Sequence, residues 1–184
     1  PRYGLTTTDC VFMCSRDGRA WDRPDEAFMR PGKENQWNWV YGDCYPSLGM
    51  IETSTDIPGE DPDLSLYVPM RHWSRKSTWL YRHTVRIDGF VSRHATYEPQ
   101  TLVTKPFRFT GKTLSINFET SAMGYMVVEL TDGNGRPLEG FTSCELFGDS
   151  ISRIVDFEGD LDRLNGWTVR MKITMSDADI YSFK

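Results

Sequence analysis

The seven residues TLSINFE (113–119) decide the fold of this chain. Their apolar side chains, Leu114, Ile116 and Phe118, alternate with polar ones. Successive side chains of a β-strand point to opposite faces, so the alternation predicts a strand with one face in a core and the other in water. The same pattern returns in VRMKITM (169–175), near the end of the sequence. The second half is therefore predicted to be β-structure around one core.

Short β-rich runs separated by turn residues surround this stretch. Residues 125–130 are more continuously apolar, as expected for a strand covered on both faces. The segments TGK (110–112) and DGNG (132–135) have the composition of tight turns that tolerate positive φ. About seven strands at this spacing indicate an antiparallel β-sandwich, and a small closed barrel is the alternative. The strands are expected near residues 101–109, 112–120, 124–131, 138–144, 150–157, 167–175 and 179–183.

The first half has longer loops and most of the Trp residues. Residues 54–63 hold two Pro and four acidic residues, which predicts a solvated loop. The segment IDGF (87–90) marks the expected junction between a first domain, 1–87, and a second, 88–184. Only residues 160–166 suggest a helix, and only a single turn, so the predicted fold class is all-β. Strands of the first half are expected at 9–15, 21–23, 45–53, 64–71 and 78–88.

Composition and charge exclude several classes of protein. The 184 residues are 39% hydrophobic and 26% charged, which is typical of a folded globular chain rather than a disordered one. The net charge of −5 provides no basic field for nucleic acid or an anionic membrane. No apolar run approaches the ~20 residues of a transmembrane helix. The opening PRYG (1–4) has no Met and no signal peptide, so we expect a processed product or a portion of a longer protein.

The four cysteines favour free thiols over a disulfide framework. Cys10 and Cys14 lie on one predicted strand, where four residues span roughly 13 Å, which is too far to bridge. Cys44 and Cys144 lie in different halves of the chain. We expect buried free thiols, with disulfides as the alternative.

The segment SRDGRAW (15–21) is the most informative short motif. Asp17 can accept backbone N–H groups of a tight turn, while Gly18 adopts the left-handed conformation. Trp21 then returns on the next strand to pack over the hairpin. The pattern, which begins at Ser15, resembles the Asp-box-like hairpin between outer strands of β-propeller blades in sialidase-like and other glycosidase-like proteins. Its expected role is structural.

The order of segments after this hairpin extends the resemblance over nearly the whole chain. The succession WDRP (21–24), AFMRPG (27–32), WNW (37–39) and YPSLGM (45–50) resembles the last blade and a half of a five-bladed glycoside hydrolase of the sucrose- and fructan-cleaving type. Such enzymes carry a β-sandwich directly after the propeller. The segments DGFVS (88–92), TLVTKP (101–106) and DADIYSF (177–183) are similar to the C-terminal regions of uncharacterised bacterial proteins of this kind. The resemblance implies propeller blades in 1–87 and a sandwich in 88–184.

The chain departs from that family at the catalytic motifs. Fructan-cleaving enzymes carry an Asp nucleophile in W-x-N-D-P-N-G, an Arg-Asp-Pro stabiliser and a Glu-Cys acid/base, and none of these is intact here. Arg16-Asp17-Gly18 is similar to Arg-Asp-Pro but falls in the hairpin, and Cys144-Glu145 has the reverse order. Glycosidic cleavage requires two carboxylates roughly 5–10 Å apart. The sequence shows no such pair, so the catalytic residues stay unassigned.

Aromatic and charged residues near two predicted strands are candidates for carbohydrate binding. Aromatic rings stack on the C–H faces of sugars, while carboxylate and Arg groups bind hydroxyls. The alternatives are that the two Trp fill an interface between blade and sandwich and that the Arg-His-Trp segment is a solvated hairpin tip. The candidates are Trp37, Trp39, Asp43, Tyr45, Arg71, His72 and Trp73.

No cofactor is indicated. The oxygens of residues 132–135 and 177–179 leave open a structural calcium ion, with turn chemistry as the alternative. His72, His83 and His94 recur every eleven residues, but this spacing fits no metal-ligand geometry, so solitary satisfied histidines are expected.

These observations predict the C-terminal, accessory portion of a glycoside-hydrolase-like protein, not catalytically complete alone. The alternatives are a non-catalytic carbohydrate-binding or surface-adhesion module and a structural β domain without a ligand. The expected partners are carbohydrate and the remainder of the parent propeller, with a homo-oligomer left open and neither nucleic acid nor membrane. A secreted or periplasmic location is favoured if the parent carries a signal peptide.

Overall fold

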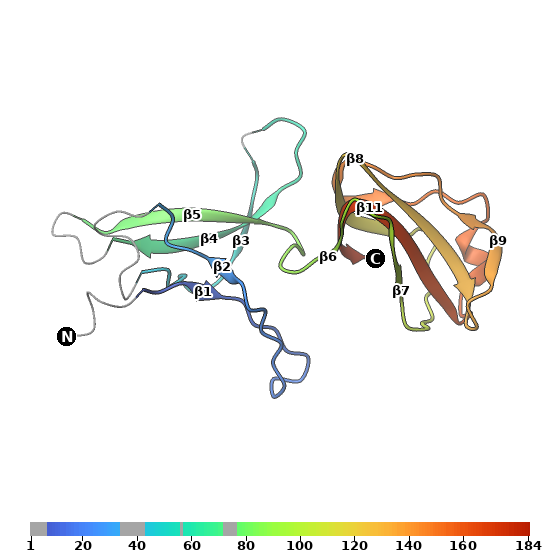
Figure 1. The fold of residues 1–184 in the computed structure, drawn as a ribbon, viewed down its shortest axis with the longest axis horizontal. Coiled ribbons are helices and arrows are strands. Elements are labelled where there is room, and N and C mark those ends of the chain that lie inside the picture. The colour runs from blue at the N-terminus through green and yellow to red at the C-terminus, as the bar shows by residue number, and fades with distance from the viewer. Residues whose placement is uncertain (1–6, 34–42, 56, 72–76) are drawn as a thin grey trace. The chain divides into compact units, whose positions relative to one another are not determined.

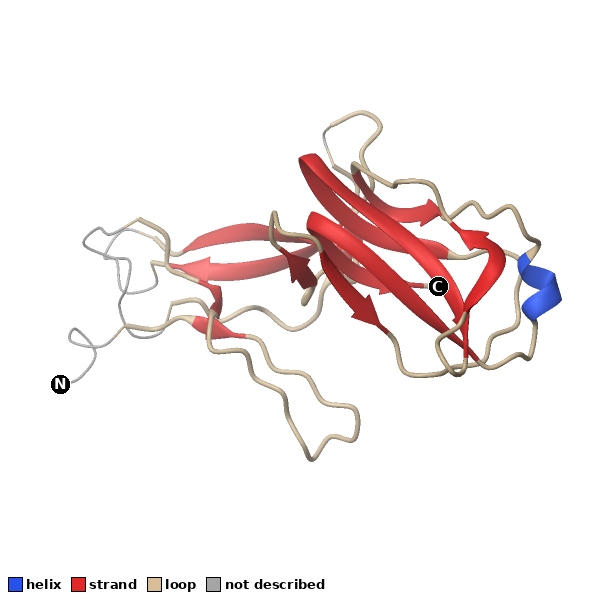
Figure 2. Cartoon of the chain, turned by 45° about the vertical axis from the view of Figure 1, so that its right-hand side comes forward, coloured by secondary structure: helices blue, strands red, loops and turns tan. Residues whose placement is uncertain are grey.

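A computed structural model describes residues 7–33, 43–55, 57–71 and 77–184 of the chain (Figure 1). The chain divides into two compact units, Pro1–Ile87 and Asp88–Lys184. The described part is all-β: every sheet is antiparallel, and the only helical segment in these ranges is the 3₁₀ turn η1 (Leu161–Leu164) (Figure 2). The predicted fold class is thus confirmed at this level, whereas the propeller blades and the sandwich stay predictions.

The first unit contains two small sheets. Strand β1 (Cys10–Val11) pairs with β2 (Ala27–Met29), and the chain between them is closed by a bridge between Cys14 and Asp22. Strands β3 (Ile51–Thr53), β4 (Asp63–Met70) and β5 (Trp79–Arg86) form the second sheet in that order. Since β4 lies in the middle, β5 is an edge strand of this sheet within the described residues.

One face of β4 supplies much of the first unit's core. Leu66, Val68 and Met70 alternate along the strand and are buried, because successive side chains point to opposite faces. Residues of the β1–β2 sheet and of the segment before β3 cover this face. The cluster consists of Met29, Cys44, Val68 and Met70, with Cys10 and Phe28 packed against it.

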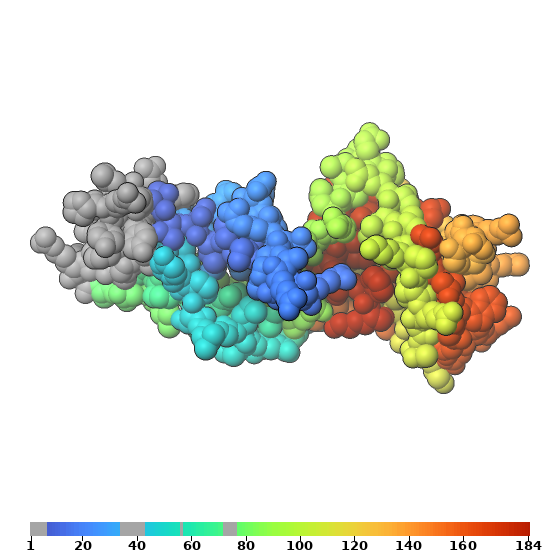
Figure 3. All heavy atoms as spheres, turned by 90° about the horizontal axis from the view of Figure 1, so that it is seen from below, coloured from blue at the N-terminus to red at the C-terminus, as the bar shows by residue number. Residues whose placement is uncertain are grey.

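The second unit is organised by two long strands, β8 (Ser115–Asp132) and β11 (Val169–Phe183), which pair along most of their length. At one end they are flanked by β10 (Asp149–Ile154) and β6 (Arg93–Ala95). At the other end they are flanked by β9 (Pro137–Thr142) and β7 (Gln100–Val103). Figure 3 shows the yellow-green β7 segment lying against the red of β11.

An irregularity separates the two ends of these long strands. The β8–β11 register shifts between Ser176 and Ala178, and Asp177 there has a φ of 45°. Both ends nevertheless contribute to one buried cluster, which includes Phe118 from one end and Met171 from the other. The six strands thus form one antiparallel sheet, and both of its ends contribute to a single core.

Several sequence predictions can be compared with these elements. Segments 112–120 and 124–131 were expected as separate strands, as were 167–175 and 179–183, but each pair is one continuous strand. The predicted strand 45–53 is reduced to Ile51–Thr53. In β11 the predicted inward residues, including Val169 and Ile173, are buried, which confirms the alternation. The polar face of β8 is only partly in water, because Asn117 is 2% exposed.

Candidate functional site

Strand β5 carries a row of ring side chains on one face. Trp79, Tyr81 and His83 lie directly opposite Met70, Val68 and Leu66 of β4 and therefore share the face that forms the core. Unlike those residues, the Trp79 and Tyr81 side chains remain 49% and 41% exposed. Their ring centroids lie 6.1 Å apart at an interplanar angle of 27°, and the Tyr81 and His83 rings follow at 6.5 Å. The row offers exposed ring surface at the sheet edge.

A cavity of about 250 Å³ lies between this row and the end of β2, and we call it the β2–β5 pocket. Tyr81 and His83 line it from β5, and Met70 from β4. The segment that follows β2 provides the remaining lining, with Pro31 buried and both cationic residues exposed. That segment is Arg30, Pro31, Gly32 and Lys33.

Arg71 extends the site at the far end of the row. Its guanidinium carbon lies 4.9 Å from the centroid of the Trp79 ring, within the range of a cation–π interaction. Arg71 follows β4 directly and has a φ of 61°, which is uncommon for a residue other than Gly. Its backbone N–H donates to Oδ2 of the buried Asp43 at 2.9 Å. This hydrogen bond fixes the backbone at Arg71, whose guanidinium lies over Trp79.

The thiol of Cys44, the residue that follows Asp43, is expected to be unreactive. Burial raises the pKa of the Cys44 thiol to about 11, and the negative charge of Asp43 adds to the effect. Cys44 is 4% exposed and its Sγ lies 4.0 Å from the Met70 sulfur. A protonated, enclosed thiol is a poor nucleophile, so Cys44 acts as a core residue.

The structure brings together two of the residues that the sequence predicted for carbohydrate binding, Asp43 and Arg71. Tyr45 is 51% exposed, two residues beyond Asp43. The other four predicted residues lie outside the described residues. They are Trp37, Trp39, His72 and Trp73.

The Asp-Gly hairpin is held by the side chains of Ser15 and Asp17. Oδ1 of Asp17 accepts the backbone N–H groups of Arg19 and Ala20, each at 2.8 Å, and the Ser15 hydroxyl at 3.1 Å. These bonds lower the pKa of the Asp17 carboxyl, the two backbone bonds most. Gly18 has a φ of 69°, and Trp21 is 55% exposed. The oxygen of Asp17 is thus engaged in the turn.

Sequence reasoning missed the β2–β5 pocket. His83 was interpreted as a solitary histidine, and Arg30 was given no role, because nothing local connects residue 30 with residue 83. The spacing Trp79-x-Tyr81-x-His83 on a predicted strand was the available signal, since period-2 rings must share a face.

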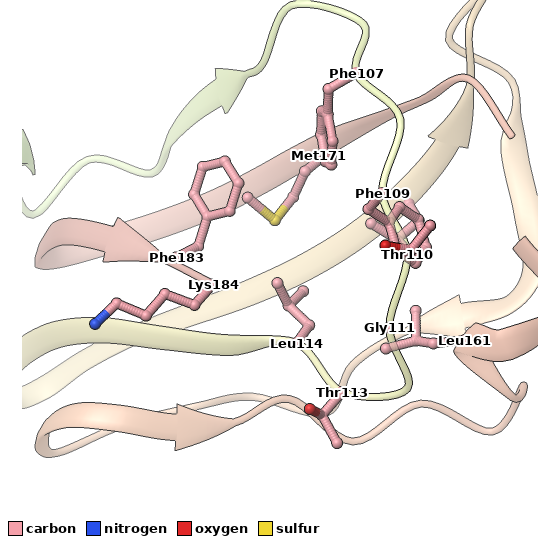
Figure 4. A pocket seen from close by; sticks show the side chains of 11 residues that line it. Phe107, Phe109, Thr110, Gly111, Thr113, Leu114, Leu161, Met171, Phe183 and Lys184 are labelled. Carbon is pink, nitrogen blue, oxygen red and sulfur yellow. The ribbon is translucent and has the colours of Figure 1, made fainter. Parts of the chain in front are cut away.

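The second unit has a separate apolar cavity of about 220 Å³ (Figure 4). Phe107, Met171 and Phe183 gather on one side of it, and the two Phe ring centroids lie 5.9 Å apart. Leu114 and Leu161 line it further along. The cavity is continuous with the core and offers no row of cations, so it is less suited to a polar ligand.

In the two loops considered for calcium, the carboxylates of Asp132 and Asp179 accept hydrogen bonds from the protein itself. Oδ1 of Asp132 accepts the N–H groups of Asn134 and Arg136 at 2.8 and 2.9 Å, and these bonds lower the pKa of its carboxyl. Asp179 bonds His94 and Ser92 at 2.9 and 2.5 Å. Within the described ranges, no group of three or more His, Cys, Asp or Glu is arranged to hold a metal ion.

Comparison with known proteins gives no family assignment. No protein-family profile, no curated protein and no solved structure matches this chain. In the part of the chain that the structure describes, no helix has the length and apolarity needed to cross a membrane.

Proposed function

We propose that the chain is an accessory, glycan-binding portion of a glycoside-hydrolase-like protein, and that it binds sugar at the β2–β5 pocket rather than cleaving it. The observation that carries the proposal is the exposed row of Trp79, Tyr81 and His83 beside a cavity. Sugar rings present C–H faces that pack on aromatic rings and hydroxyls that bond to polar groups at the rim. The pocket supplies both kinds of surface.

The accessory role is supported by two carboxylates, those of Asp43 and Asp17, which already accept hydrogen bonds within the protein. Asp43 is fully buried and accepts the Arg71 N–H, while Asp17 braces a hairpin. Hydrolysis requires one carboxylate to protonate the leaving oxygen and another to attack or activate water. Among the described residues, those that line the β2–β5 pocket include no carboxylate.

The proposal is tested by calorimetric titration of the 184-residue chain with fructo- and cello-oligosaccharides, after a glycan array has selected a ligand. Trp79→Ala and Tyr81→Ala should each weaken binding about tenfold, or ~1.4 kcal/mol. Leu80→Ala is the matched control, because Leu80 is 65% exposed and alternates to the opposite face of β5. Binding to no array member, or equal binding by all three variants, would refute the proposal.

A second experiment separates this function from a stand-alone adhesion module. If the parent is glycosidase-like, the gene should encode, before Pro1, further blades with inward-facing Asp and Glu. A preceding region without such blades would favour the adhesion module, with the same pocket as its binding surface.

A further inference from the structure

We propose that the β2–β5 pocket selects a sugar unit bearing an anionic oxygen group, either the carboxylate of a uronate or a sulfate ester. This inference rests on the glycan-binding function proposed above and specifies its ligand class. Arg30 and Lys33 line the pocket on the β2 side, and His83 lines it on the β5 side. A neutral sugar does not require an exposed guanidinium such as that of Arg30 at one small cavity.

Arg30 is the clearest element of this selectivity. It lies directly after β2, its side chain is exposed, and it forms no hydrogen bond or ion pair with the described residues. The chain has a net charge of −5, whereas Arg30 places a positive charge at the rim of the pocket. Arg presents a planar fork of N–H donors that matches carboxylate and sulfate oxygens.

Arg71 adds positive charge at the other end of the aromatic row. Its Nε is buried and has no hydrogen-bond partner among the described residues. The nearby Asp43 accepts the backbone N–H of Arg71, and its side chain is 0% exposed, so it presents no carboxylate surface to a ligand. Arg71 therefore places a guanidinium group against the exposed row, at Trp79.

The size of the pocket restricts the ligand to one sugar unit. Its volume of about 250 Å³ lies below the ~300–1,000 Å³ of pockets that enclose drug-sized molecules. A single ring fits beside Tyr81, with its anionic group toward Arg30. Neighbouring units of an oligosaccharide then extend along the row toward Trp79.

The test compares β-1,4-linked oligoglucuronate, a sulfated cello-oligosaccharide and the neutral cello-oligosaccharide of equal length, each titrated into the 184-residue chain. We expect an anionic probe to bind about tenfold more tightly than the neutral one, with a preference that declines as salt rises. Arg30→Gln should remove this preference and Arg30→Lys should retain part of it. Arg82→Gln is the matched control, because Arg82 is exposed on the opposite face of β5.

Each outcome of this test either supports the inference or overturns it. Preference for oligoglucuronate identifies a carboxylate ligand, and preference for the sulfated probe identifies a sulfate ligand. Equal affinity for all three probes, or a preference that survives Arg30→Gln, overturns this inference and leaves the glycan-binding function standing. Equal binding of polyglutamate would reveal a general anion surface and also overturn it. Failure to bind any glycan overturns both proposals.

Discussion

Arg71 contacts two residues that lie outside its own stretch of sequence, Asp43 and Trp79. Its left-handed backbone conformation is held by the bond to Asp43, 28 residues earlier, and its guanidinium covers Trp79 on the neighbouring strand. Strained backbone conformations persist only where the surroundings impose them. The position of Arg71 is therefore a product of the fold and not of the local residues around it.

The cysteines provide a prediction at the same scale. Cys14 and Cys144 are exposed, contrary to the expectation of buried thiols, whereas Cys44 is enclosed with a pKa of about 11. Burial also raises the pKa of the Cys10 thiol. Since the thiolate is the reactive form, brief iodoacetamide treatment of the folded protein should modify Cys14 and Cys144 and spare Cys44. Peptide mass spectrometry reads this out; rapid labelling of Cys44 without denaturant would contradict its placement.

His94 makes the stability of the second unit depend on pH. The hydrogen bond to Asp179 raises the pKa of His94 above its ordinary value of 6.5, and the charges of Asp179 and Asp177 add to it. The stabilisation is complete below about pH 6.5 and is lost as the pH rises through the raised pKa. We expect thermal unfolding to show this loss in the pH range that begins at about 6.5. His94→Gln should flatten the curve in that window, and an unchanged curve would exclude His94 as its source.

At the scale of elements, β8 and β11 approach each other closely at Gly124. A Cβ placed there would overlap the carbonyl oxygen of Asp177 and lie 2.9 Å from that of Ser176. Gly124→Ala should therefore destabilise the protein by about 1–3 kcal/mol, measured by urea unfolding. Gly133→Ala is the control, because its nearest contact would be an ordinary 3.4 Å to the Thr168 methyl; a shift there within about 0.5 kcal/mol is expected. Equal effects would show that the close approach is not what Gly124 serves.

The strands could be located from the sequence, but their continuity could not. Alternating residues identified both long strands, since burial of one face imposes period 2. The prediction interrupted one strand at residues 121–123, just before Gly124, and the other at residues 176–178, which include Asp177. In the structure they accommodate a register irregularity inside paired strands.

The candidate site was predictable in part for a similar reason. Arg71 and Asp43 were selected for their charge beside aromatic residues. Arg30 and His83 were not, because only pairing of β4 with β5 and the course of the chain after β2 bring them to one cavity. The sequence pattern shows which residues of a strand share a face. Which segment packs on that face depends on how distant parts of the chain pair, and in which register.

On the scale of the whole molecule, every described residue that lines the β2–β5 pocket belongs to the first unit. Phe118, the largest of the described side chains that are fully buried, belongs to the second. Binding and the stability of the larger core should therefore be separable. Phe118→Ala removes a fully buried ring and should lower the free energy of unfolding of the second unit by about 3–5 kcal/mol. Oligosaccharide affinity, measured by calorimetry below the unfolding transition, should stay within twofold of the unmodified chain.

Met70→Ala, which alters the pocket lining and removes a buried side chain from the first unit's core, should weaken binding. A loss of affinity in Phe118→Ala comparable to that in Met70→Ala would show that sugar binding depends on the second unit, against the site proposed here.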